Sequence, residues 1–230
     1  MLASSIVKTG LYWSGNNPWI DDLNPKGYFE NPQIHNINEA VLETCMPSPL
    51  VTLGKSHPAT KFAPNGERWL GLLEDWAEPL VRDDHSKMIA NYLAKCPNDK
   101  PFVLKDPRFS YALPAWMPQL NSTIYICVFR DPLSVANSIV RMCSHFTHLQ
   151  PMGINVAYAL NLWECINRYI LDNLSRSGNW LFIHARQILD KNDRQRIEER
   201  IGHSLNKSFL DSNIIGHGYL LIGYPPTRHM

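Results

Sequence analysis

The sequence predicts one α/β domain in which helices cover both faces of a parallel sheet. Three short runs carry apolar residues at successive positions: 102–104, 124–129 and 180–183. Stretches with helical spacing separate most of them, which is typical of strands buried on both faces. A chain of 230 residues with 44% hydrophobic content can bury one such core. No repeat, low-complexity tract or linker divides it, so residues 1–230 are predicted to form a single domain.

Apolar residues at helical spacing, with stop signals, predict the helices. In chain order these are residues 1–8, 30–44, 69–93, 132–142, 155–174 and 190–201. Gly10 stops the first helix and Gly202 ends the last one. Residues 45–65 are rich in proline and glycine, which predicts a long surface loop.

Composition excludes several classes of function. The formal net charge is +1 and only 19% of residues are charged, so no basic stripe exists for nucleic acid or an anionic membrane. Five scattered cysteines without a CxxC pair argue against zinc, a disulfide scaffold and secretion, and favour the reducing cytoplasm. His145 and His148 alone make an incomplete metal site, so no metal is expected. No apolar run is long enough to span a bilayer, and no signal peptide is visible.

A cation and an Asp-Pro pair follow the second apolar run. Asp131 suits a helix N-cap and Pro132 the first helical position. Arg130 is therefore expected at the carboxyl end of a parallel strand, the edge where ligands bind, with Ser138 two helical turns on. A guanidinium and a hydroxyl suit a phosphate group. The residues alone leave an alternative open, in which Arg130 pairs with Asp131 or a surface carboxylate and Ser138 is a packing residue.

The first apolar run has the same layout. Asp106 is predicted to cap a helix that Pro107 opens and Pro114 ends early. Lys105 is then expected at the same edge of the sheet as Arg130. Two ordinary capped helices would explain both Asp-Pro pairs, but not the cation that precedes each.

These segments resemble a known family. The stretch Arg130-Asp-Pro-Leu-Ser-Val-Ala-Asn-Ser138 is similar to the 3′-phosphate-binding segment of sulfotransferases that use PAPS (3′-phosphoadenosine 5′-phosphosulfate). Further segments resemble motifs of the bacterial members in the same order: Asn24-Pro-Lys-Gly-Tyr-Phe-Glu-Asn31, Asn38-Glu39, Val103-Leu-Lys-Asp-Pro-Arg108, Leu113-Pro-Ala-Trp116 and Leu162-Trp-Glu164. Together they cover most of the chain and thin out after about residue 205.

The resemblance implies a P-loop-NTPase-like three-layer sandwich that transfers a sulfuryl group from PAPS to a hydroxyl or amine. The acceptor would be a small molecule or glycan-like, chosen by loops at 45–65 and 143–155. Glu30 would be the base and Lys105 the cation that steadies charge in transfer, while Arg130 and Ser138 would hold the 3′-phosphate. A second interpretation of Glu30, as the cap or first-turn acid of the helix that follows, stays open.

The chain also departs from the family pattern. Residues 1–7 resemble the helix after the loop of type Arg-Ser-Gly-Thr-Ser that binds the 5′-phosphosulfate, so that loop and its strand are expected to be missing. The loss would leave an apolar gap beside the sheet and favour association with another chain, as in a homo-oligomer. Two hypotheses follow: an active transferase, or an inactive relative that binds nucleotide weakly or acts as an interaction protein. A nucleotide kinase is disfavoured because no Gly-x-x-x-x-Gly-Lys-Ser/Thr stretch occurs.

Overall fold

The structure, a computed structural model, describes residues 2–7, 11–13, 20–25, 27–46, 50–52, 55–57, 67–73, 79–97, 99–210 and 218–223. The α-helices are α1 (Leu2–Val7), α2 (Pro32–Leu42), α3 (Asp83–Leu93), α4 (Phe109–Trp116), α5 (Pro132–His145), α6 (Val156–Tyr169) and α7 (Lys191–Ile201). The strands are β1 (Leu50–Thr52), β2 (Lys55–His57), β3 (Phe102–Lys105), β4 (Thr123–Phe129), β5 (Asn179–His184) and β6 (Gly218–Gly223). Shorter turns of helix are η1 (Arg68–Leu70), η2 (Met117–Gln119), η3 (Gln150–Met152), η4 (Ile170–Leu174), η5 (Ala185–Ile188) and η6 (Lys207–Phe209).

The central sheet has the strand order β3-β6-β4-β5. β4 and β5 are parallel, whereas β6 pairs antiparallel with both β3 and β4. The three predicted strands therefore share one sheet, but the expectation of an all-parallel sheet is wrong because β6 makes the sheet mixed. Since β6 is antiparallel to both neighbours, β3 and β4 run in the same direction. Their carboxyl ends, at Lys105 and Phe129, lie at the same edge, as predicted.

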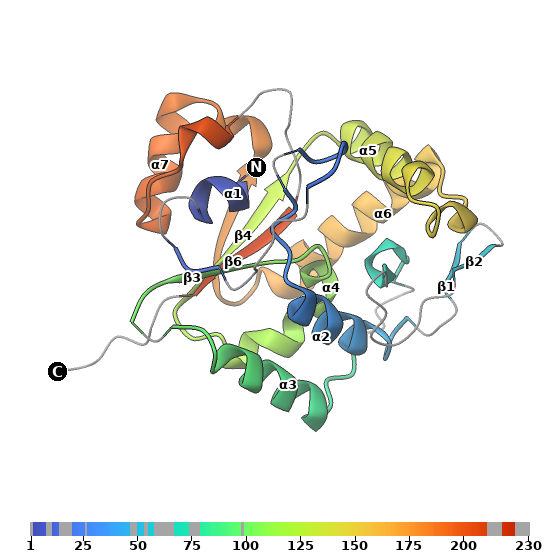
Figure 1. Cartoon of the computed structure of the whole chain (residues 1–230), viewed down its shortest axis with the longest axis horizontal. Coiled ribbons are helices and arrows are strands. Elements are labelled where there is room, and N and C mark those ends of the chain that lie inside the picture. The colour runs from blue at the N-terminus through green and yellow to red at the C-terminus, as the bar shows by residue number, and fades with distance from the viewer. Residues whose placement is uncertain are drawn as a thin grey trace.

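β6 fills the position where the sequence predicts an exposed gap. Within β6, Ile222 lies opposite Val103 of β3 and Ile124 of β4, and Leu221 and Ile222 are buried. Figure 1 shows the red strand β6 next to β3 and β4 in the middle of the molecule. The prediction of an apolar gap beside the sheet is therefore wrong, and association with a second chain loses that basis.

Helices lie on both faces of the sheet, as the apolar runs predict, but β5 is an edge strand in which Phe182 is exposed, so the prediction that 180–183 is fully buried is wrong. Tyr125 and Leu221 join a core with α2 to α6, and Ile126 and Ile222 join a second core with α1 and α7. Figure 1 shows α1 and α7 on one side of the sheet, and α2, α3, α4 and α6 on the other. Within the described part of the chain, no helix is long and apolar enough to cross a membrane.

The predicted helix 69–93 is wrong as a single element. Its first turn is η1, after which Gly71 is extended, and α3 begins only at Asp83. Residues 74–78 lie outside the described residues. Trp69 and Leu73 are buried as their spacing predicts, but in a turn and an extended segment, because Gly71 and Pro79 interrupt the helix.

Other boundaries differ less. α4 continues through Pro114 to Trp116, so the prediction that Pro114 ends this helix is wrong. Because proline has no backbone N–H, Pro114 leaves the Ser110 carbonyl without its helical hydrogen bond, but the helix continues. The predicted loop 45–65 contains the short antiparallel pair β1 and β2, and its residues 47–49, 53–54 and 58–65 lie outside the described residues, as do Met1 and 8–10.

Candidate functional site

The turn between β3 and α4 carries the centre of the site. The Asp106 carboxylate is fully buried and accepts a hydrogen bond from the backbone N–H of Arg108 at 2.8 Å. The prediction that Asp106 caps a helix opened by Pro107 is wrong: α4 begins at Phe109 with Arg108 at its N-cap, and the Asp106 carboxylate bonds only within the turn before the helix. This turn directs the Arg108 side chain into the protein, where 1% of it is exposed.

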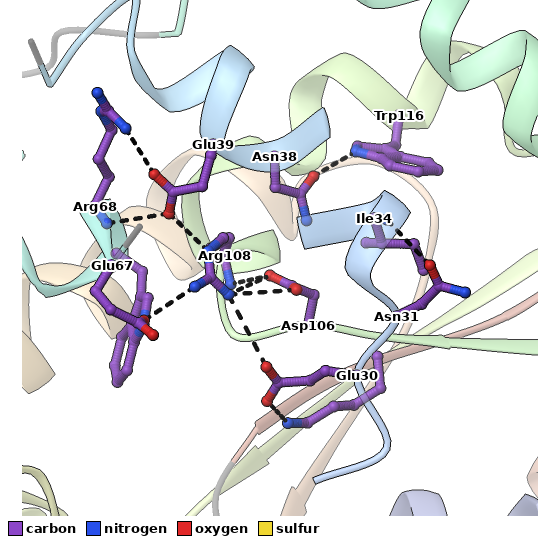
Figure 2. A network of polar contacts seen from close by, with 12 residues as sticks. Glu30, Asn31, Ile34, Asn38, Glu39, Glu67, Arg68, Asp106, Arg108 and Trp116 are labelled. Atoms are coloured by element: carbon purple, nitrogen blue, oxygen red, sulfur yellow. Dashed lines mark hydrogen bonds and ion pairs between the residues drawn. The ribbon is translucent and has the colours of Figure 1, made fainter. Parts of the chain in front are cut away.

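Four carboxylates surround the Arg108 guanidinium (Figure 2), and together they form the "carboxylate cluster": Glu30, Glu39, Glu67 and Asp106. The distances are 2.7 Å from Nε to Glu39 Oε1, 3.0 Å from Nη2 to Glu67 Oε2 and 3.3 Å from Nη1 to Asp106 Oδ1. Glu30 Oε2 lies farther away, at 4.0 Å from Nη1. Burial alone would lower the pKa of Arg108, but the four carboxylates hold it above its ordinary value.

Glu39, in α2, joins Arg108 to a second buried arginine. Its carboxylate accepts from Arg108 Nε at 2.7 Å, from Arg68 Nη1 at 2.8 Å and from the Arg68 backbone N–H at 3.2 Å. Burial would raise the pKa of Glu39, but Arg108 and Arg68 outweigh it and lower this pKa below its ordinary value. Arg68 also donates from Nε to the Met46 carbonyl at 2.9 Å, so α2, η1 and the β3–α4 turn are held together.

The negative charge of Glu67 is the least well neutralised in the carboxylate cluster. It accepts from Arg108 Nη2 and, in a short contact, from the indole Nε1–H of Trp69. Burial raises the pKa of Glu67, Arg108 opposes that rise, and the negative charges of Glu30 and Glu39 add to it, so this pKa is about 7. A carboxyl with this pKa changes its charge near neutral pH.

Glu30 and Lys105, the predicted base and cation, are in direct contact. Lys105 Nζ donates to Glu30 Oε1, and both side chains are mostly buried. Their positions differ by 75 in the sequence, so tertiary structure creates the pair. The alternative role of Glu30 as a helix cap is wrong: Asn31 caps α2, accepting from the Gln33 backbone N–H at 2.7 Å, and α2 begins at Pro32.

The residue before Glu30 has a strained backbone. Phe29 has a φ of 57°, in the left-handed region that bulky residues avoid. Its buried ring packs against Trp13 at a centroid distance of 5.1 Å, which holds the conformation in place. Such strain persists only where the surrounding structure enforces it, and it is concentrated at functional sites.

A small cavity of about 30 Å³ lies at the carboxyl ends of β3 and β4. It is lined by Trp69, Lys105, Pro107, Val128, Phe129, Val135, Ile139, Trp163, Ile166 and Asn167. This volume holds one or two waters, whereas small-molecule sites have hundreds of cubic ångströms. A nucleotide does not fit inside it.

Arg130 and Ser138 lie near this edge but do not line the cavity. Asp131 caps α5 as predicted, accepting from the Ser134 backbone N–H at 2.8 Å. Arg130 Nη2 donates to the Ser134 carbonyl at 2.6 Å, so the guanidinium folds back on the first turn of α5. Ser138 is half-buried in the same helix. The structure therefore brings Glu30 and Lys105 together, but not Arg130 and Ser138 with them.

Sequence reasoning missed most of the carboxylate cluster. Glu39 carried a signal: among Ile37, Ala40 and Val41 on an apolar stripe, a carboxylate needs a buried cation. Arg108 ends a segment that resembles a family motif, but nothing in the sequence indicates that its side chain is buried. Glu67 follows a proline- and glycine-rich stretch and shows no pattern that predicts its contacts.

Comparison of the chain with protein-family models, curated proteins and solved structures finds no significant match. Among the described residues, no group of three or more His, Cys, Asp or Glu side chains is arranged to hold a metal ion. A functional argument therefore rests on the site's own geometry.

Proposed function

We propose that the protein transfers a sulfuryl group from PAPS to a hydroxyl or amine of a small-molecule or glycan-like acceptor. The contact between Glu30 and Lys105 at the carboxyl edge of the sheet carries this proposal. The resemblance selects Glu30 as the base, and its place at the end of a strand selects Lys105 as the cation, although the two are distant in the sequence. Their meeting beside a cavity that Lys105 lines supports that assignment.

The proposed chemistry needs one proton acceptor and one fixed positive charge. PAPS supplies an activated sulfuryl group, whose sulfur forms a bond to the acceptor oxygen or nitrogen while its bond to the 5′-phosphate breaks. Glu30 takes the proton that the acceptor loses, and adenosine 3′,5′-bisphosphate leaves. Lys105 stabilises the negative charge on the transferring group and the leaving oxygen. An ammonium has three N–H donors, so Lys105 can hold Glu30 with one and the donor with another.

Arg130 and Ser138 are proposed to hold the 3′-phosphate of the donor. Burial and the nearby positive charge of Arg141 lower the pKa of Arg130, so a bound phosphate would relieve repulsion between two cations. The N-terminus of α5, a helix of 14 residues, also favours an anion. Because the cavity is too small for a nucleotide, the nucleotide would lie outside it, along the strand ends.

A P-loop-NTPase-like sandwich is the finer fold that we propose. The helices on both faces of the sheet and the shared carboxyl edge of β3 and β4 support it, and the antiparallel β6 is a departure from it. We also propose a cytoplasmic location, since all five cysteines are free thiols.

A second candidate is an inactive relative that binds nucleotide weakly or acts as an interaction protein. Two observations favour it: the cavity holds only water-sized molecules, and the Arg130 guanidinium already bonds the Ser134 carbonyl. Nucleotide binding must then displace an internal hydrogen bond, which lowers affinity.

Calorimetric titration with adenosine 3′,5′-bisphosphate and adenosine 5′-phosphate tests the donor site. Arg130→Lys should weaken bisphosphate binding by about 1.5–3 kcal/mol, the scale of a charged hydrogen bond, and Ser138→Ala by about 0.5–1.5 kcal/mol. Neither variant should change binding of the 5′-phosphate, which lacks the group they hold. Equal losses for both nucleotides would contradict the assignment.

Transfer from radiolabelled PAPS to phenols, amines and oligosaccharides tests the chemistry. Glu30→Gln should keep bisphosphate binding and lose about 100-fold or more in transfer, because the proton acceptor is gone. A wild-type protein that binds the bisphosphate but transfers to no acceptor would select the second candidate.

A further inference from the structure

Among the described residues, the carboxyls of the carboxylate cluster outnumber the cations that they contact. Four carboxyls (Glu30, Glu39, Glu67 and Asp106) contact three cations (Lys105, Arg68 and Arg108) in a mostly buried region. Burying an uncompensated carboxylate is costly, so one carboxyl of the cluster should hold a proton.

The contacts identify Glu67 as that carboxyl. Glu39 accepts three N–H groups from two arginines, and Asp106 accepts the Arg108 backbone N–H as well as its guanidinium. Glu30 has the ammonium of Lys105. Among the described residues, Glu67 has ion-pair contact only with Arg108, which it shares with the three other carboxyls, and its second donor is the neutral indole of Trp69.

We propose that Glu67 holds the extra proton of the carboxylate cluster and, through the shared guanidinium of Arg108, positions Glu30. Glu67 is thus a positioning residue for the base. The consequence for turnover rests on the proposed sulfuryl transfer, whereas the coupling of Glu67 to Glu30 does not.

The guanidinium transmits the effect because it contacts both carboxyls. Nη2 lies 3.0 Å from Glu67 Oε2, and Nη1 lies 4.0 Å from Glu30 Oε2, beyond hydrogen-bond distance. When Glu67 is protonated, Arg108 has one carboxylate fewer to neutralise and attracts Glu30 more strongly. Ionisation of Glu67 reverses this, because Glu67 then competes with Glu30 for the guanidinium.

Several charged and titratable groups face Glu67, and their protonation bears on whether Glu67 changes its charge near neutral pH. Among the described residues they include Arg108, Glu30, Glu39, Tyr28 and Cys143. Arg108 and Glu39 stay charged, since carboxylates raise the pKa of Arg108 and arginines lower that of Glu39. Burial keeps Tyr28 protonated and raises the pKa of Cys143 to about 12.

The indole N–H of Trp69 reports the charge of Glu67 directly, because it donates to that carboxylate. In ¹H–¹⁵N spectra without nucleotide, Trp69→Phe identifies the Trp69 indole signal among the seven tryptophans. We expect the wild-type signal to titrate with a midpoint near pH 7, and to be independent of pH in Glu67→Gln. Glu30→Gln should move the midpoint lower by about half a pH unit or more, since a negative neighbour is removed.

Glu199→Gln is the matched control. Glu199 is an exposed carboxylate in α7, on the opposite face of the sheet, so this variant should keep the wild-type midpoint. The other six indole signals confirm that each variant is folded. A Trp69 signal that stays constant from pH 5 to 9 in the wild type, or still titrates in Glu67→Gln, overturns the assignment. A midpoint that Glu30→Gln does not move overturns the coupling.

Turnover gives a separate readout. If the protein transfers sulfuryl groups, its rate should rise with pH around 7, and Glu67→Gln should abolish that rise. A rise that persists in Glu67→Gln would overturn the role of Glu67 in positioning the base. Absence of any transfer would count against the proposed function alone, because the indole titration needs no substrate.

Discussion

Two turns of the molecule share a sequence layout and differ in almost every contact. In each, a cation at the end of a strand is followed by Asp-Pro: Lys105 before Asp106, and Arg130 before Asp131. Asp106 is fully buried beneath a guanidinium, whereas Asp131 is exposed and caps α5. Lys105 contacts a carboxylate from another part of the chain, but Arg130 bonds a carbonyl four residues ahead.

The residue after each proline accounts for much of the difference. Arg108 turns inward and attracts Glu39 and Glu67, while Leu133 at the matching position is exposed. The same local motif therefore starts a helix in one place and organises a buried charge network in the other. The local sequence determines where the aspartate bonds the backbone, and residues distant in the sequence determine which charged groups meet at the turn.

The largest expected effect is the loss of Arg108. Arg108→Met should lower the free energy of unfolding by about 3–5 kcal/mol, because buried carboxylates lose their shared partner. Arg130→Met should cost less than about 1 kcal/mol, as expected for a partly exposed residue. Urea denaturation measures both, with Arg168→Met, which breaks the exposed pair with Glu164, as a control near zero. Similar losses at Arg108 and Arg130 would remove the contrast between the turns.

The charge network around Arg108 in the first turn and the Asp131 cap in the second should also differ in how the free energy of unfolding depends on pH. In the first, the group concerned is Glu67, which contacts Arg108. The folded pKa of Glu67, about 7, lies above its ordinary 4.5, so between these values the folded state keeps a proton that the unfolded state has released. Stability is then lost as pH rises through this window, by about 3 kcal/mol. Glu67→Gln should remove that loss, which denaturation at pH 5, 6, 7 and 8 would detect.

Asp131 has the opposite dependence. The backbone N–H of Ser134 lowers the pKa of Asp131, so its contribution is present above its ordinary pKa and lost as pH falls through the folded value. Asp131→Asn should therefore leave the slope between pH 5 and 8 unchanged, and a changed slope would contradict this view of the second turn.

A third effect concerns β6, which separates the two turns. A Cβ atom at Gly223 would lie 2.2 Å from the Phe102 ring, its partner in β3. Gly223→Ala should cost about 1–3 kcal/mol by overpacking, and Phe102→Ala in the same chain should recover part of that cost. The double-mutant cycle, measured by denaturation, checks the register. Purely additive losses would mean that β6 does not lie against Phe102.

The smallest expected effect is the loss of the α5 cap. Asp131→Ala should lower the melting temperature slightly, and less than Gly223→Ala, because an exposed cap satisfies one backbone N–H. Asp131→Ser should retain most of the cap. Thermal unfolding followed by circular dichroism compares the three proteins, and a larger loss than for Gly223→Ala would reverse the proposed ranking.

Sequence patterns predicted the elements whose signals are local. The β4 strand, the Asp131 cap and the Gly202 stop could all be located, since each depends on residues a few positions apart. No strand was predicted at Gly218–Gly223, although its residues are apolar between glycines, because its place between β3 and β4 depends on distant pairing. The roles of Glu30 and Lys105 were predicted, but their direct contact was not, because it joins residues that are distant in the sequence. No local pattern indicated the contacts of Glu67.

The position of β6 also bears on how the chain assembles. The strand that lies between β3 and β4 comes last of the three in the sequence: β4 ends at Phe129 and β6 begins only at Gly218, where Gly223 pairs with Phe102. During synthesis, β3 and β4 leave the ribosome without the neighbour that joins them, and α5, α6, β5 and α7 are made before it arrives. Closure of the sheet is thus a late, long-range event, which slows folding and leaves strand edges open to chaperones in the meantime.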